Sequence, residues 1–234
     1  GLTNEQLEYF GKAKDVWKVS LRDMPYVISQ NLYGATTVAA TMRIAAMAGI
    51  KIFVTGGIGG VHRGAETSMD ISADLTEMAQ TSVAVVSAGV KSILDIGLTL
   101  EYLETKGIPV ITYGQDEFPS FYSRKSGFTS PLRLDTTAEI ALLLDTKWKL
   151  GLTGSVLIAN PVPAEQEMAT DEMELHIQKA LNAAKEKNIS GKNVTPFILQ
   201  YIAEHTKGES LETNIALIKH NAKVGAEIAV EYAG

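Results

Sequence analysis

The chain of 234 residues contains no cysteine and only four histidines. Without cysteine it can form neither a disulfide nor a thiolate nucleophile, and scattered histidines alone do not make a structural zinc site. The sequence also lacks a block of Lys or Arg and any apolar stretch near the roughly 20 residues that span a bilayer. A net charge of −6 without a basic cluster does not suit the phosphate backbone of nucleic acids. We therefore expect no membrane and no nucleic acid among the partners, whereas a phosphorylated small molecule needs only a local cluster of donors.

The residues that are present, 45% hydrophobic and 21% charged, are typical of a globular protein. At this length one substantial core is expected, so we predict a single α/β domain over residues 1–234. The chain does not open with the pattern of a signal peptide, which makes the cytoplasm the expected compartment.

Strand and helix patterns alternate along the first two thirds of the chain. Short β-branched and apolar runs predict strands at residues 16–20, 50–55, 83–87, 108–113 and 154–161. Helical periodicity and capping residues predict helices at residues 3–12, 37–48, 73–79 and 98–106, and a further helix capped by residues 135–139. This alternation predicts a three-layer α/β/α fold with a parallel-rich mixed central sheet.

The last third of the chain is predicted to be helical, at residues 170–188, 195–205 and 210–232, with Gly191 and Gly208 as separators. The amphipathic faces of these helices need a partner, so we expect this C-terminal region, about residues 165–234, to pack on the same core. A long loop at residues 115–131 carries four aromatic side chains. Either these side chains pack against the rest of the protein, or the loop is a lid over a substrate.

Lys91 is the first candidate catalytic residue, because it follows a buried strand pattern and precedes a helical one. Burial disfavours the charged form of an amine, and a neutral amine can attack carbon and form a Schiff base. The alternative is a lysine at a strand end whose stem covers apolar surface and whose ammonium stays in water.

The glycine-rich segment at residues 55–60 and His62 allow two interpretations each. Glycines after a strand let backbone N–H groups approach a phosphate, but this segment matches no phosphate-binding pattern cleanly, and a tight structural turn is an equal alternative. His62 follows as either a hydrogen-bonded structural residue or part of a site.

Asp70 and Asp74 flank Ser72 in a second candidate segment. One or two carboxylates completed by water suit Mg²⁺ or Mn²⁺. Asp70 or Ser72 could instead be the N-cap of the helix that follows.

Several blocks of sequence together resemble the pseudouridine-5'-phosphate glycosidase family, which includes the indigoidine-synthase-A-like proteins. They occur in one order at residues 18–25, 34–40, 55–66, 70–75, 91–95 and 195–197. The resemblance extends almost from end to end of the chain, and the blocks at 55–66 and 70–75 are long enough to be specific.

This resemblance implies a role for particular residues. Lys91 would be the nucleophile that attacks the anomeric carbon, and Asp70 would coordinate one Mn²⁺ per subunit. The residues that would contact the substrate are Lys18, Val38, Ser72, Ala73, Asp74, His62 and Asn214. A phosphate site is expected among backbone donors near residues 36–38 and Ser72. A homo-oligomer, a trimer in this family, is also implied.

The implied reaction is the reversible cleavage of pseudouridine 5'-phosphate to uracil and ribose 5-phosphate through a Lys–ribose imine. Two other functions stay open. A Schiff-base sugar-phosphate aldolase or lyase would also use Lys91 but would need neither Asp70 nor a nucleobase, and a sugar-phosphate- or nucleotide-binding module would not catalyse a reaction. The family's N-terminal segment, with its proton-donor Glu, has no counterpart in these 234 residues. We therefore expect the chain to be a fragment that retains ligand affinity better than turnover.

Overall fold

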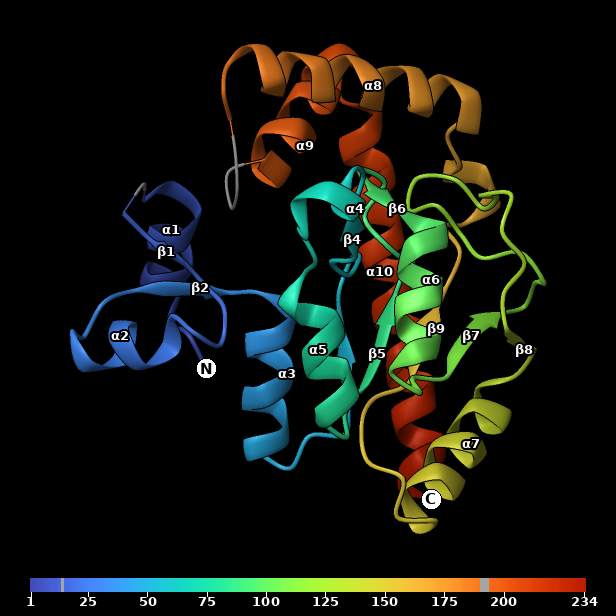
Figure 1. Ribbon diagram of the computed structural model, residues 1–234. Helices are drawn as coiled ribbons and strands as arrows, with labels where there is room; N and C mark the ends of the chain where they lie inside the picture. Colours follow the sequence, from blue (N-terminus) through green and yellow to red (C-terminus); the bar gives the residue numbers. More distant parts are fainter. Residues whose placement is uncertain (14, 190–193) are drawn as a thin grey trace.

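The computed structural model describes residues 1–13, 15–189 and 194–234, so the predicted separator Gly191 lies outside the described residues. Its central sheet has five strands in the order β3–β5–β9–β7–β8 (Figure 1). The strands are β3 (Ile52–Val54), β5 (Ala84–Ser87), β7 (Val110–Tyr113), β8 (Leu132–Leu134) and β9 (Leu157–Ala159). Each neighbouring pair is parallel, as in Phe53 opposite Val85 and Ile111 opposite Ile158.

The predicted three-layer α/β/α class is confirmed, although the expected mixed pairing is wrong for the central sheet. Antiparallel pairing occurs instead in a separate ladder of β4 (Val61–His62) and β6 (Leu94–Asp95). The physical reason is that long crossover connections, helices in most cases and the long loop between β7 and β8, join the central strands and make parallel neighbours. The sequence analysis also missed β8, because this strand is largely exposed and carries Arg133 between two leucines instead of a continuous apolar run.

Helices cover both faces of the sheet. Successive side chains of a strand point to opposite faces, so Val85 joins one core cluster and Val86 the other. The first cluster includes buried residues of α3 (Val38–Met47), α5 (Ala73–Gln80) and α6 (Ile96–Thr105). The second is formed with α7 (Thr137–Lys149) and α10 (Glu209–Ala233), and Figure 1 shows α7 next to the C-terminal part of α10.

The remaining C-terminal helices belong to the first cluster. Met173 of α8 (Thr170–Glu186) and Ile198 of α9 (Val194–His205) are buried with residues of the sheet. A single 3-10 turn, η1 (Ala164–Gln166), precedes them. Figure 1 shows α8 and α9 at the end of the molecule where β4 and β6 lie, which is the end where β5 leaves the sheet.

The N-terminal residues form a small unit beside α3 (Figure 1). It contains α1 (Asn4–Lys12), β1 (Trp17–Val19), α2 (Met24–Ser29) and β2 (Gly34–Thr36), and the two strands pair in parallel with Lys18 opposite Ala35. The predicted capping box between Thr3 and Gln6 is present. The short α2 and β2 were not predicted, because neither is long enough to repeat an apolar pattern.

The long loop after β7 packs its aromatic side chains onto the body. Phe118, Phe121 and Tyr122 are buried, whereas Phe128 is partly exposed. Of the two interpretations of this loop, packing of its aromatic side chains against the rest of the protein is therefore the better one.

The next helix is capped by Thr136, whose side chain forms a capping box with Glu139, within the predicted capping segment.

Within residues 1–13, 15–189 and 194–234, none of the helices has both the length and the hydrophobicity that crossing a lipid bilayer requires.

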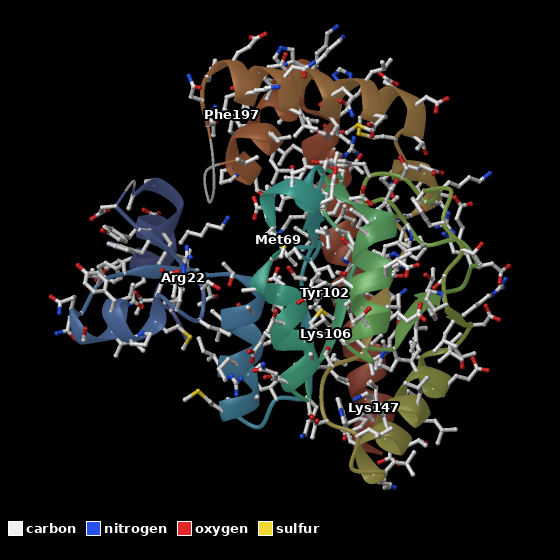
Figure 2. All side chains as sticks on the ribbon, in the orientation of Figure 1. Arg22, Met69, Tyr102, Lys106, Lys147 and Phe197 are labelled. Carbon is white, nitrogen blue, oxygen red and sulfur yellow. The ribbon has the colours of Figure 1, made fainter. Side chains whose placement is uncertain are left out.

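Lys147, labelled near the end of α7 in Figure 2, is a buried ammonium that holds the loop after its helix. Its Nζ donates to the carbonyl oxygens of Leu152 and Gly154, each at 3.0 Å, and to that of Thr153. We expect Lys147→Met to lower the free energy of unfolding by about 2–3 kcal/mol, because the carbonyl groups of Leu152 and Thr153 lose their donor, whereas Gly154 O keeps the Trp148 Nε1–H. Urea denaturation measures this change. The control is Lys149→Met on the exposed side of the same helix, and equal midpoints for both variants would contradict the prediction.

Candidate active site

Lys91 lies in the segment that leaves β5 at the carboxyl end of the sheet. The regular strand ends at Ser87, but pairing with the glycine-rich segment continues beyond it. The N–H of Ile58 donates to Gly89 O at 3.1 Å, and the N–H of Lys91 donates to Ile58 O at 3.1 Å. Lys91 is therefore held by an irregular extension of the β3–β5 pair. Ligands of parallel α/β sheets bind at this end of the strands.

Asp74 is a buried carboxylate whose position is set from two directions. Its Oδ1 accepts the N–H of Ala39 at 2.9 Å, and its Oδ2 accepts the N–H of Gly59 at 2.8 Å. Only 4% of the residue is exposed. The two N–H donors thus fix both carboxylate oxygens of Asp74 between the start of α3 and the glycine-rich segment.

The three charged groups Lys91, Asp74 and Lys18 influence one another. Burial lowers the pKa of Lys91 from its ordinary value, the Asp74 carboxylate opposes this shift, and the Lys18 ammonium lowers the pKa further. Lys18 comes from β1 of the N-terminal unit, so the fold brings together residues that are far apart in the sequence. A lowered pKa increases the neutral fraction of the amine, which is the nucleophilic form. Between the two interpretations of Lys91, this environment favours a reactive amine.

Two helices begin at this cluster. Val38 is the first residue of α3, and Ala73 is the first residue of α5, whose N-cap is Ser72. The Ser72 Oγ accepts the N–H of Asp74 at 3.2 Å, so the capping interpretation of Ser72 is confirmed. A residue can cap a helix and still face a ligand. The predicted substrate residues from α3 and α5 therefore lie on either side of the Asp74 carboxylate.

The glycines at residues 56–60 allow close packing around the cluster. A Cβ atom at Gly59 would lie 2.2 Å from Ser72 Oγ, and one at Gly60 would lie 2.5 Å from Thr99 Oγ1. Any larger residue would displace one of these neighbours. The contacts favour the interpretation of the segment as a tight structural turn rather than a phosphate loop.

His62 and Asp70 lie next to each other at the edge of the site. The N–H of His62 donates to Asp70 O at 3.0 Å, and His62 Nδ1 lies 3.8 Å from Asp70 Oδ2. The Asp70 side chain is 54% exposed and is not a helix cap. Met69, the residue before it, is labelled in Figure 2 between α4 (Ala65–Ser68) and α5.

The donor set around Asp70 suits a cation that keeps most of its water. In the part of the chain that the structure describes, no three His, Asp or Glu side chains converge on a common metal position. One exposed carboxylate with an imidazole nearby is compatible with Mn²⁺ or Mg²⁺ completed by water and substrate, but not with a closed protein cage.

Asn214 lies on α10 against the glycine-rich segment, where a Cβ atom at Gly56 would be 3.6 Å from its Oδ1.

The sequence interpretation missed a buried pair near Asn214, formed by Asn221 and Asn160. Asn221, fully buried on the same helix, donates to Thr55 O at 2.9 Å and accepts from Asn160 Nδ2 at 2.9 Å. The sequence did contain a signal for this residue, because Asn221 is a polar residue at a helical position between the apolar Leu217 and Val224.

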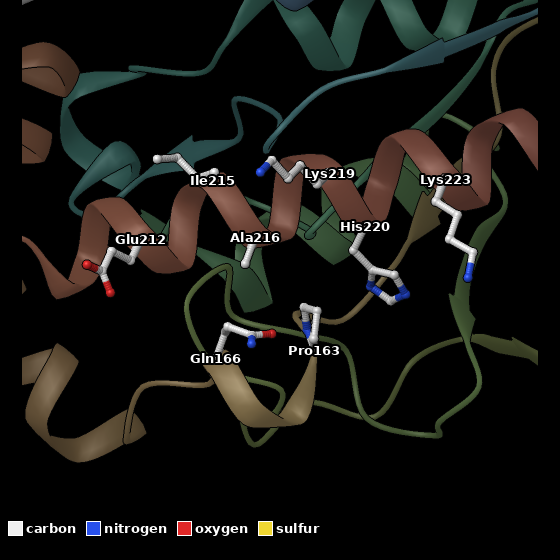
Figure 3. Close-up of a pocket in the computed structure, with 8 residues that line it drawn as sticks. All are labelled: Pro163, Gln166, Glu212, Ile215, Ala216, Lys219, His220 and Lys223. Atoms are coloured by element: carbon white, nitrogen blue, oxygen red, sulfur yellow. The ribbon is translucent and has the colours of Figure 1, made fainter.

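A cavity of about 470 Å³ lies between α10 and the segment of Pro163 and Gln166 (Figure 3). His220 points from α10 towards Pro163, whereas Lys219 points away from it. None of the residues predicted for the site lines this cavity. It is separate from the cluster around Lys91.

The fold and the site define an α/β protein with a partly buried amine and a fixed carboxylate at the carboxyl edge of a parallel sheet. A model of the family described as "Indigoidine synthase A like protein" matches residues 1–231, and the chain belongs to this family.

Curated relatives agree with this assignment. The chain is 60% identical to a protein of Deinococcus radiodurans and 58% identical to one of Geobacillus kaustophilus, both named pseudouridine-5'-phosphate glycosidase. These matches cover 100% and 99% of the chain but 74% and 77% of the relatives. The chain thus spans about three quarters of their length.

Two solved structures are similar over the whole chain. One is a prealnumycin C-glycosynthase in complex with ribulose 5-phosphate, with a TM-score of 0.92 and 36% identity, covering 100% of this chain and 77% of that one. The other is an indigoidine synthase A-like protein from Thermotoga maritima, with a TM-score of 0.90 and 40% identity, covering 99% and 76%. These matches confirm the predicted fold class.

Proposed function

We propose that this chain is a pseudouridine-5'-phosphate glycosidase, an enzyme that breaks the carbon–carbon glycosidic bond to give uracil and ribose 5-phosphate. The observation that carries the proposal is the cluster of Lys91, Asp74 and Lys18 at the carboxyl edge of the sheet. The names of the relatives, at up to 60% identity over the chain, support the substrate.

The proposed chemistry depends on a neutral amine. Ordinary glycosidases protonate a leaving oxygen, but a carbon–carbon glycoside has no such oxygen. The Lys91 nitrogen bonds to the anomeric carbon as the bond from that carbon to the ring oxygen breaks, and the ring oxygen takes a proton to become a hydroxyl. The nitrogen lone pair then forms a C=N bond while the bond to uracil breaks. The electron pair of that bond goes to uracil carbon 5, which takes a proton. Water hydrolyses the imine to ribose 5-phosphate and restores the amine.

The other residues of the site hold the substrate. We assign the phosphate to the starts of α3 and α5, near residues 36–38 and Ser72, because helix N-termini favour anions and Lys18 adds positive charge. Val38, Ala73 and Asp74 would line the ribose, and Asn214 and His62 would border the pocket. The Asp74 carboxylate would also partly offset the positive charges of Lys91 and Lys18.

We assign one Mn²⁺ per subunit to Asp70, with His62 beside it. When bound, this ion would supply positive charge that stabilises developing negative charge on the substrate.

Asp70→Ala should weaken Mn²⁺ binding and lower activity together, because the only carboxylate assigned to the ion is removed. Calorimetric titration of Mn²⁺ measures the binding directly. Asp171→Ala, an exposed acid in the first turn of α8, is the control. Full activity of Asp70→Ala in chelator-treated buffer would contradict the assignment.

Release of ultraviolet-absorbing uracil from pseudouridine 5'-phosphate, with Mn²⁺ present, tests the function. A Schiff-base aldolase would form a borohydride-trapped imine with a sugar phosphate but release no uracil. A binding module without catalysis would bind the nucleotide and do neither. Trapping of ribose 5-phosphate without uracil release, even after addition of a chain that carries the family's proton-donor Glu, would favour the aldolase over the glycosidase.

We further propose that the chain forms a single domain and assembles as a homo-oligomer of three copies in the cytoplasm. The core cluster shared by the sheet, α8 and α9 supports the single domain. Exposed apolar side chains of the N-terminal unit, such as Tyr26 and Ile28, support an interface. The mass in solution from light scattering tests the number of copies.

A further inference from the structure

Arg63 joins two parts of the molecule that are distant in sequence. It follows β4 directly, and its Nη1 and Nη2 donate to the two carboxylate oxygens of Glu174 on α8, at 2.6 and 2.9 Å. The Glu174 carboxylate is held in turn by Gln178, whose Nε2 donates to it at 2.7 Å. These two parallel hydrogen bonds fix the orientation of the Arg63 guanidinium as well as its distance from Glu174, and a lysine side chain cannot form both of them.

Arg63 also reaches the segment that carries Lys91. Its Nη2 lies 3.4 Å from the carbonyl oxygen of Ser92, the residue after Lys91. The antiparallel ladder brings the two segments together, with Val61 opposite Asp95 and His62 opposite Leu94. Lys91 is therefore held from the glycine-rich segment through its own N–H and from α8 through the next carbonyl group.

This contact borders a cavity of about 420 Å³ that includes Arg63, Ser92 and Glu174 in its lining. The Ser92 Oγ is buried and has no hydrogen-bond partner among the residues that the structure describes. The left-handed Gly89, with a φ of 85°, lies two residues before Lys91. Because the Lys91 segment contains a glycine and adjoins a cavity, a contact from another element such as Arg63 is needed to hold it in place.

We propose that Arg63 is a positioning residue that holds the Lys91 segment against α8 and so sets the direction of the Lys91 amine. This rests on the proposed function of Lys91 as the nucleophile. Loss of this positioning should lower the reaction rate measurably, because a displacement of about 1 Å in an active site can lower the rate about 10²-fold. Arg63 does not touch the substrate in this role.

The decisive variant is Arg63→Lys, which keeps the positive charge but cannot bridge both oxygens of Glu174. We expect kcat to fall about 10- to 100-fold with little change in KM. The rate at which borohydride traps ribose 5-phosphate on Lys91 should fall by the same factor. The matched control is Arg133→Lys at the far edge strand, where Arg133 also bridges two carboxylates, Asp116 and Asp135. It should leave both rates unchanged.

A purely structural role would lower the melting temperature and the yield of Arg63→Lys but leave the trapping rate of the folded protein at the wild-type value. That result would overturn the proposal. As a second variant, Arg63→Ala enlarges the adjoining cavity, and added guanidinium should partly restore its trapping rate. The same addition should have no effect on the double variant with Glu174→Gln, and equal recovery in both would also overturn the proposal.

Hydrogen–deuterium exchange separates this proposal from the function on which it rests. Arg63→Lys should speed amide exchange in residues 88–94, and Arg133→Lys should not. Faster exchange in Arg63→Lys, together with a wild-type protein that traps no imine, would reject the proposed function while retaining the positioning role. Unchanged exchange in Arg63→Lys would reject the positioning role whatever the chemistry.

Discussion

Lys91→Met should form no borohydride-trapped adduct with ribose 5-phosphate and should release uracil at least about 10³-fold more slowly than the wild type, because the variant has no nucleophile. Methionine keeps the length and apolar stem of lysine, so the fold should be retained. Mass spectrometry of the trapped peptides locates the adduct. Lys106→Met is the control, since the Lys106 ammonium lies over the Tyr102 ring on α6, where Figure 2 labels both residues.

The pH dependence of trapping gives a second measurement of the same residue. Because the neutral amine reacts and burial lowers the pKa of Lys91, trapping should reach half of its maximum below the pH expected for an ordinary lysine. Lys18→Met removes a neighbouring cation that lowers this pKa, so it should move the profile to higher pH. A trapped adduct on Lys18, with none on Lys91, would contradict the assignment of the nucleophile.

Asp74→Asn should lower activity by about 10²–10³-fold and should also destabilise the fold. The amide of asparagine can accept only through its oxygen, so the N–H of Ala39 or of Gly59 loses its acceptor. A buried donor without a partner costs about 1–3 kcal/mol, and the loss of charge adds to the effect on the reaction. Urea denaturation measures the first effect, and the rate of uracil release measures the second.

Asp74→Asn should also move the trapping profile of Lys91 to lower pH. The Asp74 carboxylate raises the pKa of Lys91 against the effect of burial, and the variant removes that contribution. Asp95→Asn is the matched control, because Asp95 also accepts a backbone N–H, from Leu98 at 2.9 Å, at a helix N-cap where asparagine is equally suitable. A pH profile that is the same in Asp74→Asn and the wild type would show that Asp74 does not act on the amine.

Local sequence patterns predicted elements that local forces stabilise. The capping box at Thr3 depends on residues close in the chain, and it is present. The strand before Lys91 is also present, because its continuous buried apolar run indicated a central strand even though its partners, β3 and β9, are distant in sequence. Strands that were missed, such as β2 and β8, are largely exposed and exist because a neighbouring strand supplies their hydrogen bonds. Neither has the run of apolar residues that indicated a buried strand such as β9.

The candidate site was found partly from residue types and mainly from family resemblance. Asp70 and Asp74 were equal candidates, since both are acids in one short segment. The structure separates them, because Asp74 is buried with two N–H donors whereas the Asp70 side chain is 54% exposed. The glycines at residues 56–60 were ambiguous for the same reason, and only their contacts with Ser72 and Thr99 indicate a packing role.

The sequence by itself determined the alternation of strands and helices, the absence of thiol chemistry and the family, because these depend on residue identity and short-range order. Only the tertiary structure decided that Lys18 acts on Lys91, that Asp74 opposes the effect of burial, and that Arg63 links Lys91 to α8. Burial and charge interactions depend on distance in space. That distance is set when the sheet and its helices pack together.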